Sequence, residues 1–249
     1  MDRASSRLVT TAHRPLMLAS VTSAAEALVC LEAGADIIDA KDPLGGALGA
    51  LAAETIRDIA ARAKAVGRPV SATIGDVECA SEVMCQAVRS VAATGVDYVK
   101  AGFLPGGEPR AAIAALGRLD LPKARLVGVL FADLDPDFGL IENMAASGFA
   151  GVLIDTSDKE KGSLTGFGNL GELSEFIGKA RANGLFAGLA GSLGLDDVAP
   201  LARLGPDILG FRGALCLDSR RTFAIDEASV KRIRSRLDAV CAPDTRAAG

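Results

Sequence analysis

Short apolar segments alternate with longer segments of mixed character along nearly the whole chain. The apolar runs contain few alternating polar positions, which is typical of strands covered on both faces. The sequence predicts such strands at 16–20, 36–41, 69–75, 98–102, 125–133, 151–156, 185–192 and 208–214. Each is followed by a segment of helical periodicity, at 22–33, 53–66, 80–94, 108–118, 137–147, 170–182, 195–204 and 226–238. Thr22 or Ser23 suits the N-cap of the first helix. Glycines at 34, 95 and 148 are expected to end their helices.

This order of elements favours one fold over its rival. Eight strand–helix units in one chain predict an α/β protein with a single (β/α)8 TIM barrel. A doubly wound open sheet is the alternative, but such sheets usually have fewer units. No Pro/Ser-rich linker divides the chain, so we expect one domain at 16–238. The N-terminal extension 1–15 and the tail 239–249 are expected to be flexible.

The composition narrows the classes of function. The 249 residues are 49% hydrophobic and carry a net charge of −4, which disfavours nucleic-acid and anionic-membrane partners. Five cysteines without metal-like spacing, and the lack of a signal peptide or apolar span, predict a cytoplasmic protein. The only histidine, His13, lies in the extension, which argues against histidine catalysis and histidine-rich metal sites. We find no dinucleotide motif, no Walker motif and no Cys/His metal spacing, which argues against a nucleotide-dependent or zinc enzyme. The helices at 22–33 and 53–66 could pack between subunits or face solvent, so a homo-oligomer stays open.

Polar residues end most of the predicted strands. In a barrel the active site lies at the carboxyl ends of the strands, so these side chains would meet at one opening. Taken singly, each is equally well explained as a helix cap or as a solvated charge at the rim. The residues concerned are Ser20, Asp39, Lys41, Thr73, Asp76, Lys100, Asp133, Asp155, Lys159, Ser192 and Arg212.

Two lysines stand out in this set. Lys100 lies inside the apolar segment YVKAG, where an ammonium group must be paired or must have a depressed pKa. Lys41 is expected to point into the same opening, with Asp39 and Asp155 as candidate partners for both lysines. A desolvated lysine near other cations can become a neutral amine nucleophile, as Schiff-base chemistry with a carbonyl requires.

The last two strands predict a phosphate site. The loops after strands seven and eight of a barrel often bind phosphate, and here they contain Gly191-Ser192 and Arg212-Gly213. Ser20 and Asp76 complete the expected substrate-binding set, and Lys159 or Lys161 could serve a second phosphate. The residues thus predict a lysine-dependent barrel enzyme acting on a phosphorylated carbonyl compound. Aldol-type chemistry, isomerisation and elimination all fit.

Longer motifs resemble one known family. They are ADIIDAKDPLGGALGA at 35–50, VSATIGD at 70–76, DYVKAG at 97–102, LIDTSDKEKGSL at 153–164, LAGSL at 189–193 and DILGFRGALC at 207–216. In this order they resemble (5-formylfuran-3-yl)methyl phosphate synthase, which makes the furan precursor of methanofuran-type one-carbon cofactors. The resemblance covers about 16–238. Ala40 stands where the family pattern has valine, a change between small apolar residues.

The resemblance implies a specific reaction. Members of the family condense two molecules of glyceraldehyde 3-phosphate with release of phosphate and water. They are carbon–oxygen lyases that need neither a metal nor an organic cofactor, so the resemblance implies none here. By motif, Lys41 would form the Schiff base and Lys100 would accept a proton. Asp39 would hold and polarise Lys41, while Asp155 and Lys159 would handle proton transfers or the second phosphate.

Two other functions remain in view at this point. A class I aldolase or a sugar-phosphate isomerase could use the same scaffold, because a fold does not define an activity. A non-catalytic sensor of phosphorylated metabolites would use the lysines only as anion ligands. Trapping with borohydride separates the sensor from the enzymes, since a sensor forms no covalent adduct.

Overall fold

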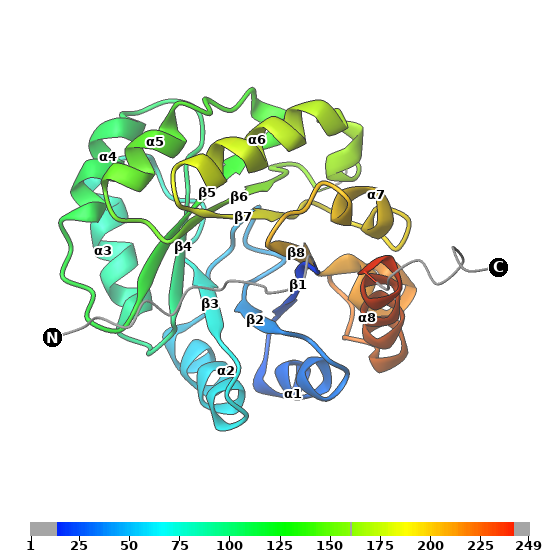
Figure 1. Cartoon of the computed structure of the whole chain (residues 1–249). Helices are drawn as coiled ribbons and strands as arrows, with labels where there is room; N and C mark the ends of the chain where they lie inside the picture. The colour runs from blue at the N-terminus through cyan, green and yellow to red at the C-terminus, as the bar shows by residue number, and fades with distance from the viewer. Residues whose placement is uncertain (1–13, 160, 242–249) are drawn as a thin grey trace, which may run out of the picture.

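The computed structural model describes residues 14–159 and 161–241 of the chain. Eight parallel strands close into a barrel in the order of the sequence, and helices surround it (Figure 1). The strands are β1 (Leu16–Val21), β2 (Ile37–Ala40), β3 (Val70–Thr73), β4 (Tyr98–Gly102), β5 (Arg125–Phe131), β6 (Gly151–Asp155), β7 (Phe186–Leu189) and β8 (Ile208–Phe211). The predicted (β/α)8 barrel is confirmed.

The eight α-helices of the described residues follow the strands one by one. They are α1 (Ala24–Glu32), α2 (Ala53–Ala65), α3 (Ser81–Ala92), α4 (Pro109–Gly117), α5 (Leu140–Ala146), α6 (Leu170–Ala182), α7 (Val198–Ala202) and α8 (Glu227–Cys241). Short 3-10 turns, η1 (Ala132–Leu134), η2 (Leu164–Gly166), η3 (Gly213–Leu215) and η4 (Leu217–Ser219), lie in the loops. None of the helices described is long and apolar enough to cross a membrane.

Several boundaries differ from the predicted ones. Strands β2 and β8 end at Ala40 and Phe211, so Lys41 and Arg212 lie just beyond the sheet rather than within it. Helix α8 continues to Cys241, past the expected end of the barrel domain at 238. The predicted flexibility of the extension 1–15 and of the tail 239–249 concerns segments that lie mostly outside the described residues.

Local sequence signals explain how the helices begin and end. The Ser23 hydroxyl caps α1 by accepting the amide of Glu26, which settles the choice between Thr22 and Ser23. Gly34 and Gly95 follow α1 and α3 with φ of +100° and +91°, a conformation that favours glycine. The predicted helix ends at these positions are therefore confirmed.

Apolar side chains fill the lower part of the barrel and form a floor beneath its carboxyl-terminal opening. Leu18, Ile37 and Ile208 form one buried cluster there. The rings of Tyr98 and Phe186 meet edge to face at 5.8 Å across the interior. The larger part of the core lies between the sheet and the helices. The floor keeps water away from polar groups that lie directly above it.

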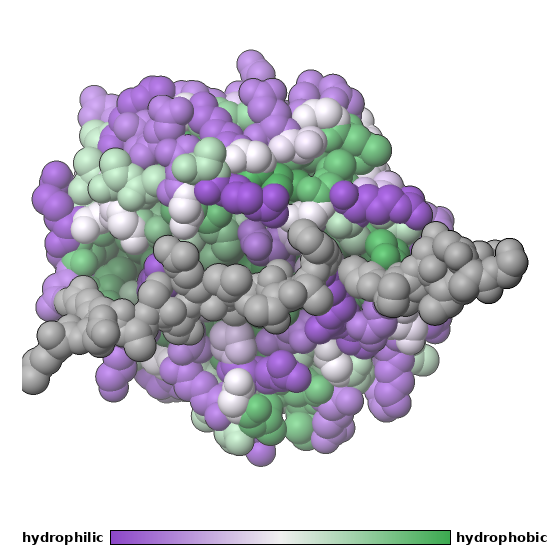
Figure 2. All heavy atoms as spheres, in the orientation of Figure 1, coloured by the Kyte–Doolittle hydropathy of each residue, from purple (hydrophilic) through white to green (hydrophobic). Residues whose placement is uncertain are grey.

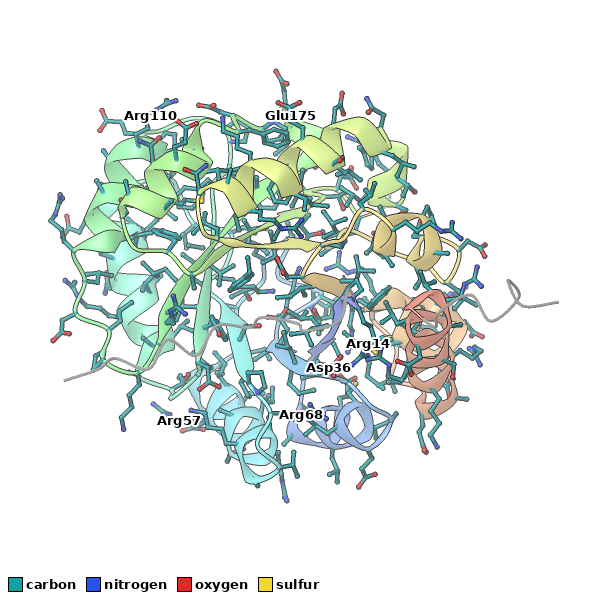
Figure 3. The ribbon with its side chains drawn as sticks, in the orientation of Figure 1. Arg14, Asp36, Arg57, Arg68, Arg110 and Glu175 are labelled. Carbon is teal, nitrogen blue, oxygen red and sulfur yellow. The ribbon has the colours of Figure 1, made fainter. Side chains whose placement is uncertain are left out.

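Charged side chains gather around Asp36, which precedes β2 at the amino-terminal end of the barrel. Its carboxylate accepts the Met17 amide and the guanidinium of Arg234, each at a distance between 2.8 and 2.9 Å. Arg14 and Arg68 approach the same carboxylate from two further segments (Figure 3). On the face shown in Figure 2, hydrophilic residues predominate over the outer sides of the helices. This end of the molecule thus joins the first and last elements of the barrel.

Candidate active site

The strand register brings the predicted polar residues together above the apolar floor. Ser20 of β1 pairs with Asp39 of β2, and Asp39 pairs with Ser71 of β3. Thr73, also of β3, pairs with Lys100 of β4. Alternation along each strand turns these side chains into the barrel, whereas their neighbours face the helices.

Asp39 is the partner of Lys100. The Lys100 Nζ donates to Asp39 Oδ2 at 2.6 Å, and the two side chains are 5% and 0% exposed. The hydroxyls of Ser20 and Ser71 donate to the same carboxylate at 2.9 and 2.6 Å. Asp39 therefore accepts hydrogen bonds from three donors and is fully buried.

Lys41 pairs with Asp155 instead, which corrects the expectation that Asp39 would hold it. Lys41 Nζ lies 3.3 Å from Asp155 Oδ2, across the opening of the barrel. Lys159 donates to the other oxygen, Asp155 Oδ1, and to the carbonyl of Thr156. Lys41 and Asp39 do share a face, but residues two apart on a strand differ by about 6.6 Å in height, so the long Lys41 side chain reaches across to β6 instead.

The shared burial of these charges shifts their pKa values. Burial lowers the pKa of Lys100 despite the opposing effect of Asp39, and the Lys41 ammonium lowers it further. Burial also lowers the pKa of Lys159 to about 8, against the attraction of Asp155. For Asp155, burial acts to raise the pKa, but Lys159 and Lys41 outweigh it and hold the pKa well below its usual range. The site therefore combines an Asp155 whose pKa is held low with two lysines, Lys100 and Lys159, whose pKa values are lowered.

Two further carboxylates hold the loops that surround the opening. Asp133 accepts the amides of Ser157 and Asp158 and so fixes the start of the loop that carries Lys159. Asp76 accepts the amides of Ala47 and Leu48 at 2.7 and 2.8 Å, in the loop 41–52 after β2. Asp76 was expected to contact substrate, but both its oxygens are engaged by that loop and it does not line the cavity.

Arg212 also differs from its expected role as a phosphate ligand. Its guanidinium forms a two-pronged ion pair with Glu26 at 2.6 and 3.2 Å. The remaining donors reach the carbonyls of Ser20, Arg221 and Phe223. All five N–H groups are thus used within the protein, and Arg212 acts as a brace between β1, α1 and the loop 212–226 after β8.

Backbone amides are available at the predicted phosphate site. Gly191 and Ser192 have φ of +113° and +47°, and a Cβ at position 191 would come within 3.0 Å of the Thr156 amide nitrogen, so glycine is required there. In the described part of the chain, no acceptor is present for the amides at 192, 193, 213 and 214. Such a group of unpaired amides next to a helical turn suits an anion.

These groups surround one cavity of about 420 Å³, a size typical of small-molecule sites. Its lining includes nearly all the sequence-predicted residues: Ser20, Lys41, Lys100, Asp155, Lys159, Gly191, Ser192, Arg212 and Gly213. Asp39 lies beneath it as the partner of Lys100. Across 14–159 and 161–241 no cluster of His, Cys, Asp and Glu side chains forms that could hold a metal ion.

Sequence reasoning missed three residues of this region. Ser71 could have been found, because it precedes Thr73 by two positions and so shares its inward face. Glu26, the partner of Arg212, lies on a helix and gives no signal of that contact. Arg221 lines the cavity from an irregular loop, where no periodicity indicates the direction of a side chain.

Comparisons with known proteins agree with the sequence motifs. A family model described as 4-HFC-P synthase matches residues 17–234. A Methylorubrum extorquens protein, provisionally named (5-formylfuran-3-yl)methyl phosphate synthase, is 45% identical over 217 residues, 87% of this chain and 89% of its own length. The synthase of that name from Methanopyrus kandleri is 36% identical over 215 residues, 82% of this chain and 90% of its own length. The synthase from Archaeoglobus fulgidus is 33% identical over 228 residues, which is 86% of this chain and 96% of its own length.

Solved structures support the fold. Phosphoribosyl anthranilate isomerase from Thermotoga maritima matches with a TM-score of 0.64 at 16% identity, over 90% of this chain and 99% of that chain. Thiamine phosphate pyrophosphorylase from Pyrococcus furiosus matches with a TM-score of 0.63 at 11% identity. This match covers 92% of this chain and 97% of that chain. At such identities the likeness concerns the fold alone. Because the family model spans most of the barrel and the named relatives align along most of their length, the chain belongs to the 4-HFC-P synthase family of enzymes.

Proposed function

We propose that the protein condenses two molecules of glyceraldehyde 3-phosphate to (5-formylfuran-3-yl)methyl phosphate through an imine on Lys41. The observation that carries the proposal is the group of three buried lysines paired with two aspartates at one cavity. The names of the relatives support it, since they specify this product. One phosphate and two water molecules leave, so the atoms balance, and the enzyme acts as a phosphate-eliminating carbon–oxygen lyase without a cofactor.

Lys41 is the nucleophile in this proposal. Three ammonium groups share two carboxylates in a buried site, which favours loss of a proton from one of them. Neutral Lys41 attacks the aldehyde carbon of one triose phosphate. The Lys100 ammonium gives a proton to the departing hydroxyl, so water leaves, the imine is protonated and Lys100 becomes neutral. Asp155, 3.3 Å from the Lys41 nitrogen, stabilises that positive charge.

Lys100 is the base for the next step. Its lowered pKa lets it accept the proton from the carbon next to the imine. The resulting enamine carbon bonds to carbon 3 of the second triose phosphate, whose bond to phosphate breaks, so the aldehyde of that second molecule is kept as the formyl group. Asp39 then holds the Lys100 ammonium that forms. Lys159, with a pKa of about 8, supplies protons to the departing oxygen atoms as the ring closes and becomes aromatic.

The phosphate of one substrate would lie on the free amides of the two glycine-containing loops. Gly191-Ser192 and Gly213 present these amides at one side of the cavity. The product would serve the synthesis of methanofuran-type one-carbon cofactors in the cytoplasm.

Intact-mass spectrometry tests this function. The protein is incubated with glyceraldehyde 3-phosphate and sodium borohydride, in parallel with a phosphate-release assay and an ultraviolet scan for the furan aldehyde. Lys41→Arg keeps the charge but cannot become a neutral amine, so it should form no adduct and no furan. Lys161→Arg is the matched control, because Lys161 is exposed, pairs with Asp158 and does not line the cavity.

Each outcome separates the candidate functions. An adduct on Lys41 together with phosphate and furan supports the proposal. An adduct without furan points to an aldolase-like enzyme, and furan without an adduct overturns the imine. Neither adduct nor furan returns the non-catalytic sensor to consideration.

A further inference from the structure

Arg221 is a cation of the cavity whose charge is not balanced by an ion pair. It is half-buried and lines the same cavity as Lys41 and Lys159. Its one hydrogen bond runs from Nη2 to the carbonyl of Gly46 at 3.2 Å. Among the described residues no carboxylate lies within ion-pair distance of its guanidinium. Four of its five N–H donors are therefore available to a ligand.

The fold holds the backbone of Arg221 in a constrained loop. Asp218 and Ser219, just before it, both have left-handed backbone angles, with φ of +53° and +57°. Such angles in residues other than glycine cost free energy and often mark functional sites. The half-buried guanidinium of Arg212 donates to the carbonyls of Arg221 and Phe223 and so fixes this segment. The brace thus directs a second arginine toward the cavity.

The described carboxylates around Arg221 attract its charge without forming an ion pair with it. The carboxylates of Asp155, Asp42 and Asp76 attract its charge from a distance, whereas Arg212 and Lys159 repel it. Asp155 already serves Lys41 and Lys159, and the oxygens of Asp76 accept loop amides. A half-buried guanidinium in this position is complementary to a phosphate group, which accepts two parallel hydrogen bonds.

We propose that Arg221 binds the phosphate of the second triose phosphate, at a site separate from the free amides at 192, 193, 213 and 214. This inference rests on the proposed function, in which two phosphorylated molecules occupy the cavity together. The backbone of Arg221 lies beside Gly213, but its guanidinium reaches the Gly46 carbonyl in the loop after β2, whereas the amides lie at the ends of β7 and β8. The alternatives named from the sequence suit this role less, because Lys159 is bound to Asp155 and Lys161 is exposed.

The test compares Arg221→Ala with Arg220→Ala. Arg220 is the matched control, because it is the adjacent arginine and is exposed, with its guanidinium over the Phe223 ring. Binding of inorganic phosphate is measured by calorimetry, and furan formation is followed over a range of glyceraldehyde 3-phosphate concentrations. The rate of borohydride trapping on Lys41 reports occupation by the first substrate alone. Circular dichroism checks that both variants are folded.

The expected results are specific to a second phosphate site. The wild type and Arg220→Ala should bind two phosphates per chain, and Arg221→Ala should bind one. Furan formation by Arg221→Ala should fall roughly 10- to 100-fold, as expected for loss of charged hydrogen bonds, while trapping on Lys41 stays within about twofold. Arg221→Lys should recover part of the rate, because it keeps the charge but not the paired donors.

Three results would overturn the inference. They are a single phosphate bound to the wild type, furan formation by Arg221→Ala at the wild-type rate, and an equal loss of trapping and furan formation in that variant. The last result would assign Arg221 to the first substrate. A wild type that yields no furan would instead refute the proposed function, which keeps the two failures distinguishable.

Discussion

The buried pair of Lys100 and Asp39 allows a quantitative prediction. Asp39→Asn keeps a side-chain oxygen that can accept a hydrogen bond, and its NH2 group can donate to the hydroxyl of Ser20 or Ser71. It removes the negative charge that lies 2.6 Å from the Lys100 ammonium. Breaking a buried ion pair by removal of one partner typically costs about 3–5 kcal/mol, because the other charge stays buried without compensation. Both side chains are almost fully buried, so this range applies here.

This loss of stability has an upper limit that depends on pH. In the Asp39→Asn variant, Lys100 can lose its proton rather than stay charged without a partner. Deprotonation of a lysine with an ordinary pKa near 10.4 costs about 4.6 kcal/mol at pH 7 and about 1.9 kcal/mol at pH 9. Burial lowers the pKa of Lys100, which reduces both limits further. We therefore expect Asp39→Asn to lose about 3–4 kcal/mol of stability at pH 7 and less than about 2 kcal/mol at pH 9.

Urea unfolding followed by circular dichroism at the two pH values measures this difference. Lys100→Met and the double variant complete a thermodynamic cycle, and the double variant should recover about 3 kcal/mol relative to the sum of the single changes at pH 7. Two results would refute this prediction. One is a stability loss in the double variant that equals the sum of the two single losses within about 0.5 kcal/mol, and the other is a cost of Asp39→Asn that does not depend on pH. As a control, the slope of unfolding free energy against urea concentration should be similar for all variants, which shows that each exposes a similar surface on unfolding.

Three further predictions concern other features of the site and its supports. The pKa of Lys159 is about 8 in the folded protein and about 10.5 in the unfolded chain, so the unfolded chain binds more protons between these values. Unfolding free energy should therefore rise with pH in this window by up to about 1.4 kcal/mol per unit, and Lys159→Met should remove that slope in urea titrations. Gly46→Ala should lower stability in thermal melts by more than Gly67→Ala, although both glycines have positive φ. A Cβ at position 46 would lie 2.0 Å from the Asp76 carboxylate, whereas a Cβ at position 67 would meet open space. Glu26→Gln should cost about 1–3 kcal/mol by leaving Arg212 without its ion pair. Burial acts to raise the pKa of Glu26, but the Arg212 guanidinium outweighs it and holds that pKa below 4.5. The cost should therefore shrink as the pH falls from 4.5 through this lowered pKa, and a constant difference across pH would contradict the assignment.

Much of the fold and part of the site follow from the sequence. Eight apolar runs separated by helical segments predict a closed parallel sheet, and the two-residue repeat within DIIDAK places Asp39 and Lys41 on one face. The same repeat in YVKAG places Lys100 inside the barrel. These inferences succeed because strand geometry is local and regular.

The choice of charge partners does not follow from the sequence. Lys41 could reach either Asp39 or Asp155, and only the height of each residue in the barrel decides between them. Arg212 and Arg221 show the same limit: a cation directly after a strand suggests a ligand, but five acceptors converge on Arg212. Arg221 follows a loop whose left-handed angles are not encoded by glycine, so its direction gives no sequence signal.

Closure of the barrel also has a consequence for how the protein is made. Strand β1 pairs with β8, and Leu16 is opposite Ile208, about 190 residues later in synthesis. At roughly 5–20 residues per second, a ribosome needs about 10 to 40 s to deliver that partner. During this interval one edge of β1 presents unpaired backbone groups, which are a template for wrong pairing. A chaperone that covers this edge of β1 until β8 has been synthesised would therefore increase the yield of folded protein.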